Sequence, residues 1–314
     1  MRKIEDGIEE ELNKILSFMA ERDASLIYKA CGSLVSRDDE LLITILCRRT
    51  KRQLHRIDMA YRNIPENKKR RTLAEKVGKE VGGNYGNFME YLCESRANFN
   101  AHMLRKAMDG LGCNAELVSE IFCTLNNAEI KEMQESFESS ADSRLGDRLR
   151  SELSGEHKRL ILKLLLAGRD ENPVADTARA RAQADELYNA IRMGKTMLGG
   201  LSSETESKIT DMLTDSSPAQ CRAIKDAFEA AYPSHPSLDA TIESKVGGAL
   251  KTALVYLLTE PVDLMCRKIK AACSGMTCDE EPISRIIGGN HMHVVQQVAD
   301  RFQEKYNQDM RKVL

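Results

Sequence analysis

The sequence repeats itself, and this self-similarity constrains the fold more than any other feature. The stretch beginning at Ile27 and the stretch beginning at Leu104 each lead into a segment with apolar residues at helical spacing. Both continue to an aromatic residue, Tyr61 in the first and Phe137 in the second, and both end at a glycine-containing loop followed by another apolar segment. A unit of this length buries its own apolar face poorly, so the repeats are expected to pack on one another.

Strand patterns are nearly absent from the chain. No period-two alternation of apolar and polar residues is sustained, and no Asn-Gly turn occurs. We therefore predict an all-α fold of four repeats, each with about five short helices. The fourth repeat is expected to be truncated, because the chain stops before its last helix. The expected boundaries are 1–20 for an N-terminal lead, 21–94 and 95–168 for the first two repeats, 169–184 for a linker, 185–259 for the third repeat and 260–314 for the incomplete fourth repeat.

Composition narrows the classes of function. The 46 basic and 48 acidic residues nearly balance, which argues against a nucleic-acid partner. No apolar run follows the basic residues at the start of the chain, so no signal peptide is expected there. No apolar run reaches the length of a membrane span. The nine cysteines include no Cys-x-x-Cys pair, which indicates free thiols in a reducing compartment rather than disulfides or a zinc site. We expect a cytoplasmic protein.

Two loops of the second repeat have the character of a cation site. The apolar helix through Leu104 is broken by Gly110 and Gly112, which let the backbone turn several carbonyls inward. Forty residues after the second glycine, Glu152 ends a helix just before Gly155. A hard cation such as Ca²⁺ takes six to eight oxygen ligands, backbone carbonyls and carboxylates among them. The two loops are therefore expected to close on one ion.

The segment from Lys106 to Gly112, followed by Ser-Glu-Leu-Ser-Gly at 151–155, resembles the calcium site of an annexin repeat. The resemblance covers nearly the whole chain, and it implies a slightly curved disc of repeats with the calcium loops on the convex face. It also implies that the metal ligands are the carbonyl oxygens of Met108, Gly110 and Gly112 and the carboxylate of Glu152.

The second repeat departs from the annexin pattern at two positions. Cys113 stands where the family has Thr, so Asn114 is expected to cap the next helix. Asp109 stands where the family often has a basic residue.

The other repeats keep less of the pattern. The first has Ser33-Leu34-Val35 in place of the glycines but retains Glu80, the third has Lys245 in place of the acid and only Glu243 to replace it, and the fourth has Thr277 in place of the second glycine. This loss of most sites resembles the divergent protist annexins, such as the alpha-giardins.

The resemblance implies calcium-dependent binding to anionic phospholipid, mainly through the second repeat, by a protein that attaches peripherally to membranes. The alternative is a cytoskeleton-associated scaffold protein that has the fold and has lost most calcium sites. An enzyme is not expected and no catalytic residue is assigned: His291 and His293 do not face the same way on a helix, and no phosphate-binding loop is present.

Three further expectations concern the periphery of the chain. Ile8, Leu12, Ile15 and Leu16 form an apolar helical stripe that could dock on the protein or bind a partner. Because the fourth repeat is truncated, Ile269, Ile286, Val295 and Phe302 are expected to be partly uncovered. The fourth repeat is then expected to be mobile, or covered by another chain or by the helix of residues 5–19, which is the favoured cover. The basic run 68–71 is expected to lie away from the bilayer that Glu152 would meet, where it could contact an acidic partner such as a filament.

Overall fold

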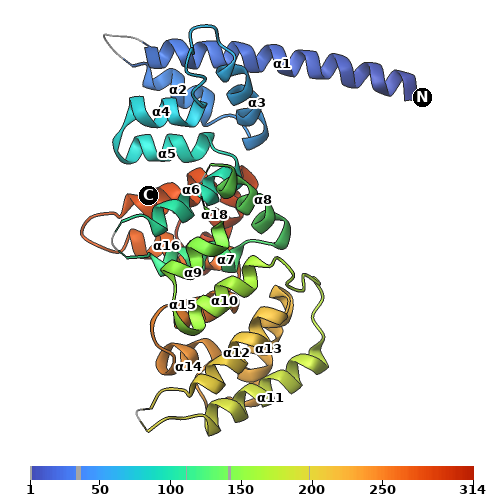
Figure 1. Ribbon diagram of the computed structural model, residues 1–314, viewed down its shortest axis with the longest axis vertical. Coiled ribbons are helices and arrows are strands. Elements are labelled where there is room, and N and C mark those ends of the chain that lie inside the picture. The colour runs from blue at the N-terminus through green and yellow to red at the C-terminus, as the bar shows by residue number, and fades with distance from the viewer. Residues whose placement is uncertain (1, 33–36, 111, 141–142, 198) are drawn as a thin grey trace. The chain divides into compact units, whose positions relative to one another are not determined.

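The computed structural model describes residues 2–32, 37–110, 112–140, 143–197 and 199–314, and these residues form nineteen helices and no strand (Figure 1). The prediction of an all-α fold is confirmed. The helices up to the linker are α1 Arg2–Gly32, α2 Asp39–Leu46, α3 Lys51–Arg62, α4 Leu73–Val81, α5 Gly83–Cys93, α6 Arg96–Met108, α7 Ala115–Thr124, α8 Asn127–Ser139, α9 Leu145–Glu152 and α10 Gly155–Leu165.

The second half of the chain continues in the same manner. Its helices are α11 Thr177–Met193, α12 Ser203–Asp215, α13 Pro218–Ala231, α14 Leu238–Lys245, α15 Gly248–Leu257, α16 Pro261–Ala272, α17 Glu280–Gly289, α18 Met292–Tyr306 and α19 Met310–Val313. The exact boundaries of the four repeats stay a prediction. None of the described helices is long and apolar enough to span a lipid bilayer.

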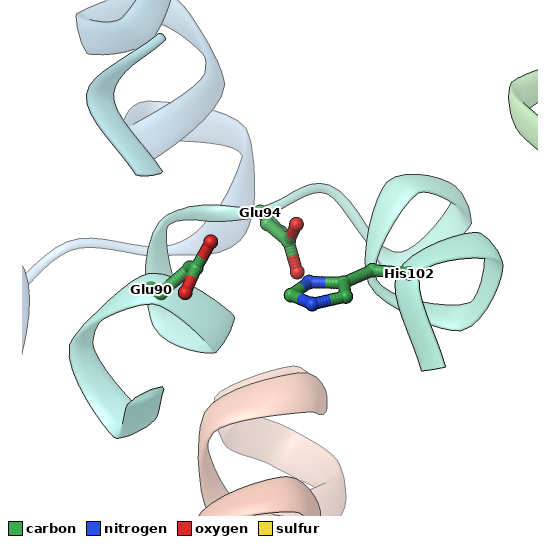
Figure 2. Close-up of side chains that lie close together, drawn as sticks. All are labelled: Glu90, Glu94 and His102. Carbon is green, nitrogen blue, oxygen red and sulfur yellow. The ribbon is translucent and has the colours of Figure 1, made fainter. Parts of the chain in front are cut away.

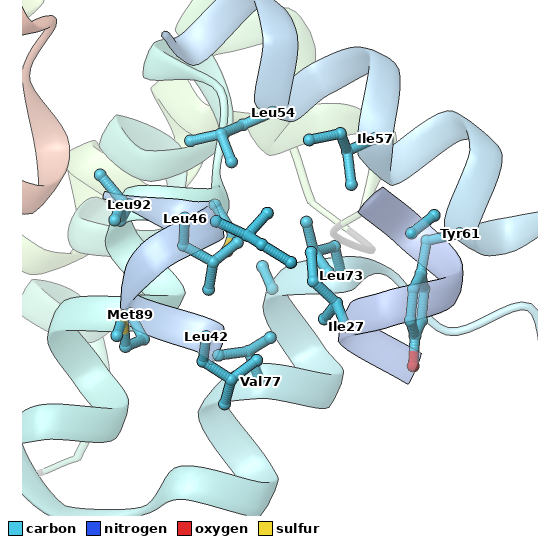
Figure 3. Close-up of a cluster of buried hydrophobic side chains, with 14 of the residues drawn as sticks. Ile27, Leu42, Leu46, Leu54, Ile57, Tyr61, Leu73, Val77, Met89 and Leu92 are labelled. Atoms are coloured by element: carbon cyan, nitrogen blue, oxygen red, sulfur yellow. The ribbon is translucent and has the colours of Figure 1, made fainter. Parts of the chain in front are cut away.

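The chain divides into two compact units. The first contains both ends of the chain, residues 1–99 and residues 265–314. Helices α1 to α5 surround one apolar core, which Figure 3 shows from its labelled side chains. Its members come from every one of these helices at helical spacing, and fully burying each large one contributes about 1.5–3 kcal/mol. The labelled residues are Ile27, Leu42, Leu46, Leu54, Ile57, Tyr61, Leu73, Val77, Met89 and Leu92.

Local sequence fixes where the helices of this unit begin. The hydroxyl of Thr50 accepts from the N–H of Gln53 while the side chain of Gln53 accepts from the N–H of Thr50, so the pair forms a capping box at the start of α3. Thr72 and Glu75 repeat the arrangement at the start of α4. Each box satisfies two N–H groups that the helix itself leaves unpaired.

Helix α17 joins the first unit through two glycines. A Cβ atom on Gly288 would lie 3.0 Å from the carbonyl oxygen of Phe88, and one on Gly289 would lie 2.2 Å from the ring of Phe99. Helix α17 therefore packs closely on α5 at Gly288, while Gly289 leaves the space that the ring of Phe99 on α6 occupies. Lys51 adds a polar tie, because its ammonium donates to carbonyl oxygens at the end of α5 and to that of Gly288.

This packing corrects the expectation that the fourth repeat is uncovered. Ile269, Ile286 and Phe302 are buried, at 0%, 3% and 0% exposure, and only Val295 is partly exposed. They are covered without the N-terminal segment, because α17 packs on α5 and the short α19 packs on α18 with Met310 buried.

The N-terminal segment also differs from expectation. Residues 2–20 are no separate docking helix but the first part of the 31-residue helix α1, which Figure 1 shows projecting past α2 and α3. Leu12, Ile15 and Phe18 are 53%, 56% and 69% exposed. The prediction that this stripe covers the fourth repeat is therefore wrong, while the side chain of Ile8 lies outside the described residues.

The second unit comprises residues 100–264 and holds the two predicted cation loops of the second repeat. Within it α7 packs on α15, α10 on α12 and α11 on α13. The side chain of Arg159 on α10 pairs with Asp211 on α12 at 2.8 Å, and Tyr256 on α15 donates to Glu116 on α7 at 2.9 Å. The helices that support the loops thus pack on one another, and ion pairs and hydrogen bonds connect neighbouring helices.

Candidate metal centre

The first loop of the candidate centre follows α6. Gly110 has φ +94° and Gly112 has φ +90°, a region that L side chains rarely adopt. A Cβ atom at either position would meet nothing within 4 Å, so it is the backbone conformation and not lack of space that requires glycine. Leu111, between them, lies outside the described residues.

The loop ends as the sequence predicts. The side-chain oxygen of Asn114 accepts from the N–H of Leu117 at 3.0 Å and so caps α7. The N–H of Asn114 donates back to the carbonyl oxygen of Ala107 at 2.7 Å, which closes the loop on the end of α6. The expectation that Asn114 replaces the usual capping residue is confirmed.

The second loop lies between α9 and α10. Glu152 is the last residue of α9, its side chain is 23% exposed, and Leu153 after it is buried. Gly155 begins α10 with φ +59°. The buried leucine anchors the loop while the carboxylate stays accessible.

A buried hydrogen bond fixes the two loops relative to each other. The Oγ of Ser119, on the helix after the first loop, lies 2.8 Å from Nε2 of His157, on the helix after the second. Burial lowers the pKa of His157 to about 4, so this imidazole is neutral at pH 7. Sequence reasoning missed this pair, because neither residue belongs to a motif.

Arg148 connects the two sets of predicted ligands. Its Nη2 donates to the carbonyl oxygen of Met108 at 2.8 Å, and its Nε lies 3.5 Å from Oε1 of Glu152. Oδ1 of Asp109 lies 3.9 Å from the same guanidinium. A carbonyl and two carboxylates thus gather around one positive charge.

The outcome for the four predicted ligands is uneven. The structure brings Met108 and Glu152 together around Arg148, whereas the described residues show no such contact for the carbonyls of Gly110 and Gly112. Asp109 enters as an unforeseen carboxylate. Its signal was in the sequence, as an acid between the helix end and the first glycine, but its reach toward Arg148 depends on how α6 and α9 pack.

The oxygen donors present suit a hard cation. Cys113 does not change this, because burial and the nearby carboxylate of Glu152 raise the pKa of its thiol, although Arg148 opposes the shift. A protonated thiol is a poor metal ligand. The donor set therefore favours Ca²⁺ over a thiolate-seeking ion.

In the corresponding loop of the first repeat, the side chain of Arg37 supplies a positive charge. Arg37 donates to the carbonyl oxygens of Glu80 and Val81 at 2.7 and 3.3 Å. The carboxylate of Glu80 is paired with Lys76 at 2.7 Å, and this hydrogen bond lowers the pKa of Glu80. Residues 33–36, which include the predicted Ser33-Leu34-Val35, lie outside the described residues.

The remaining repeats supply weaker donor sets. Lys245 ends α14, where an acid would be needed, and Gly199 with φ +86° is the part of the third loop that retains the turn. In the fourth repeat the Sγ atoms of Cys273 and Cys278 lie 3.7 Å apart. The second repeat therefore offers the better oxygen site.

Two other carboxylates lie close together at the end of α5. Glu90 and Glu94 are one turn apart, as Figure 2 shows, and both take part in further interactions of the structure. His102, drawn with them, belongs to the second unit. We assign no metal to these carboxylates.

Known proteins of the annexin family resemble this chain in sequence and in fold. A family model described as annexin matches residues 99–164. Mouse annexin A13 is 29% identical over 296 residues, which cover 93% of this chain and 89% of that protein. The structure of annexin III matches with a TM-score of 0.81 at 22% identity, covering 94% of this chain and 88% of that one. The calcium-bound structure of alpha-14 giardin matches with a TM-score of 0.73 at 19% identity, covering 94% and 93%.

Proposed function

From the premise that this chain is a divergent member of the annexin family, we propose that it binds anionic phospholipid surfaces in a calcium-dependent manner, mainly through its second repeat. The family and the fold support calcium-dependent phospholipid binding in general. The observation that carries the proposal for this chain is the gathering of the Met108 carbonyl and the Glu152 carboxylate around one positive charge.

The proposed ligands are the carbonyls of Met108, Gly110 and Gly112 and the carboxylate of Glu152. Such a set has little negative charge, so the affinity for calcium should be weak. Bound Ca²⁺ would supply positive charge that attracts the phosphate oxygens of lipids. Because calcium and lipid bind together, each should raise the affinity for the other by the same factor.

Arg148 competes for the same oxygens. Calcium can reach the Met108 carbonyl and the Glu152 carboxylate only if the guanidinium leaves them. The side chain of Arg148 is 40% exposed, so it can turn toward water without breaking the core. The protein's own cation therefore sets a threshold for calcium.

Exchange of Glu152→Gln tests the proposed ligand. We expect calcium-dependent sedimentation with phosphatidylserine vesicles to need about tenfold more calcium or to be lost, since the neutral amide replaces the ligating carboxylate. The charge-matched control is Glu135→Gln, at an exposed position of α8, which should behave as the parent. The ligand assignment is wrong if both variants bind like the parent at every calcium concentration.

One observation favours the alternative function, a cytoskeleton-associated scaffold. In three of the four repeats a basic side chain of the protein lies at or near the position where calcium would bind. These side chains are those of Arg37, Arg148 and Lys245. If the parent protein fails to sediment with anionic vesicles at any calcium concentration but sediments with cytoskeletal filaments, the scaffold function is the better description. The nine cysteines are free thiols, which supports a reducing compartment such as the cytoplasm in either case.

A further inference from the structure

A second concave site lies in the first unit, apart from any calcium loop. It is a cavity of about 210 Å³ between α1, α3, the α3–α4 loop and α4. Four cationic side chains and one carboxylate line it, together with two tyrosines and an asparagine. The lining residues are Tyr28, Tyr61, Glu66, Asn67, Lys68, Lys69, Arg71 and Lys76.

Three of these cations form no close ion pair within the described part of the chain, although Arg71 is near enough to Glu80 to add to the lowering of the pKa of that carboxyl by Lys76. Lys76 is paired with Glu80 at 2.7 Å. Among the described residues, no carboxylate forms an ion pair with Lys68, Lys69 or Arg71, although Glu66 lies in the same lining. Like charges held together repel one another, and a concave wall concentrates their field on whatever enters. The site therefore has a strong local preference for an anion.

Asn67 holds the backbone of the loop that carries these cations. Its Nδ2 donates to the carbonyl oxygens of Tyr61 and Arg71 at 3.1 and 2.9 Å, and its Oδ1 accepts from the N–H of Arg71 at 3.1 Å. The N–H of Arg70 donates to the carbonyl oxygen of Asn67 at 2.8 Å, and Arg70 takes the left-handed conformation with φ +46°. A loop fixed by four hydrogen bonds need not be ordered by its ligand, which reduces the cost of binding.

The size and chemistry of the cavity specify the class of anion. A volume of 210 Å³ is smaller than the roughly 300–1,000 Å³ of sites for drug-sized apolar ligands. The planar guanidinium of Arg71 can donate two parallel hydrogen bonds to phosphate, and the ammonium groups of Lys68 and Lys69 add point charges. Burial raises the pKa of the Tyr61 phenol, so this wall is not anionic.

We propose that this pocket binds a small anion bearing phosphomonoester groups, such as the headgroup of a phosphoinositide or a soluble inositol phosphate. Binding uses Lys68, Lys69 and Arg71 and needs no calcium. It is thus independent of the loops that hold Glu152, and the chain has two separate ways to recognise phosphate: one through a metal ion and one through its own cations.

The experiment measures binding of inositol 1,4,5-trisphosphate by calorimetry with a calcium chelator present. We expect saturable binding by the parent, weakened at least about tenfold in Lys69→Gln/Arg71→Gln through loss of two charge-assisted contacts. Lys68→Gln/Lys69→Gln, at two exposed positions, serves as a second variant if the first folds poorly. The charge-matched control Arg48→Gln/Arg52→Gln, also exposed and in the same unit, should change the affinity by less than about threefold, because distant charges are screened.

A second arm separates the two sources of the headgroup. Sedimentation with calcium-free vesicles of phosphatidylcholine and phosphatidylinositol 4,5-bisphosphate should show binding by the parent if the ligand is lipid, and no binding if the ligand is the soluble phosphate. The proposal is overturned if inositol trisphosphate does not bind, or if the control variant loses as much affinity as Lys69→Gln/Arg71→Gln. It is equally overturned if only an acidic protein filament binds to the basic loop.

Discussion

At the scale of single residues, the candidate centre depends on an arginine that no motif includes. Arg148 donates to the Met108 carbonyl and approaches Glu152, so one guanidinium engages two of the four oxygen ligands proposed for calcium. A charge-assisted hydrogen bond is stronger than a neutral one, so the arginine is a real competitor. Its partial exposure keeps the cost of displacing it modest.

Exchange of Arg148→Gln should therefore tighten calcium binding. Losing the competing contacts is worth about 1 kcal/mol, or roughly fivefold in affinity. Arg150→Gln is the matched control: it removes the same charge from the same helix, but its side chain pairs with Asp147 instead of the loop oxygens. Calcium titration by calorimetry measures both. Equal effects of the two variants would mean that Arg148 acts only through its charge and not by occupying the site.

At the scale of helices, Lys51 links three elements of the first unit. It is the first residue of α3, and its ammonium donates to the carbonyl oxygens of Tyr91, Leu92 and Glu94 at 2.5, 2.9 and 3.0 Å and to that of Gly288 at 2.6 Å. The last carbonyls of a helix have no partner within the helix, so the lysine serves as the cap of both α5 and α17. Burial lowers its pKa to about 8, and at pH 7 the amine is still a cation.

Exchange of Lys51→Met should destabilise the protein by about 3–5 kcal/mol, since it removes the charge-assisted hydrogen bonds that the buried ammonium donates to these carbonyl oxygens. The neighbouring Arg52 is exposed, so Arg52→Met should cost less than about 0.5 kcal/mol. Urea unfolding followed by circular dichroism compares the two. A loss for Lys51→Met no larger than for Arg52→Met would show that the four hydrogen bonds do not contribute to stability.

At the scale of the whole molecule, the two ends of the sequence belong to one unit. Residues 265–314 pack with residues 1–99, while residues 100–264 form the other unit. The core of the first unit begins within α1, where Ala20 and Ala24 are buried, whereas over residues 9–19 of that helix every side chain except the half-buried Leu16 is exposed. Asp23 adds a buried ion pair with Arg49 at 2.8 Å. Only the second half of α1 is therefore part of the folded core.

Two deletions test this division of α1. Removing residues 2–15 should change the free energy of unfolding by less than about 1 kcal/mol, because the side chains described in this segment, those of residues 9–15, are exposed. Removing residues 2–24 should cost more than about 3 kcal/mol, because it exposes the core around Ala24 and leaves Arg49 without Asp23. Denaturant titration measures both proteins. A large loss in the shorter deletion would contradict the exposed placement of Leu12 and Ile15.

The sequence by itself determined the features that depend on neighbours along the chain. Helical periodicity, capping residues and the absence of strand patterns were enough to predict the all-α class, the cap at Asn114 and the turn at Gly110 and Gly112, since each is set by backbone geometry within a few residues. The spacing between Gly112 and Glu152 likewise indicated which loops to consider together.

The tertiary structure decided what depends on contacts between distant segments. It buried Ile269, Ile286 and Phe302 by packing α17 on α5, left Leu12 and Ile15 exposed, and brought Arg148 to the Met108 carbonyl and to Asp109. It also gathered the cations of the α3–α4 loop around a cavity with Tyr28. Which apolar face is covered, and which cation meets which oxygen, follows from how the helices pack, and the pattern of one repeat contains no information about its neighbour.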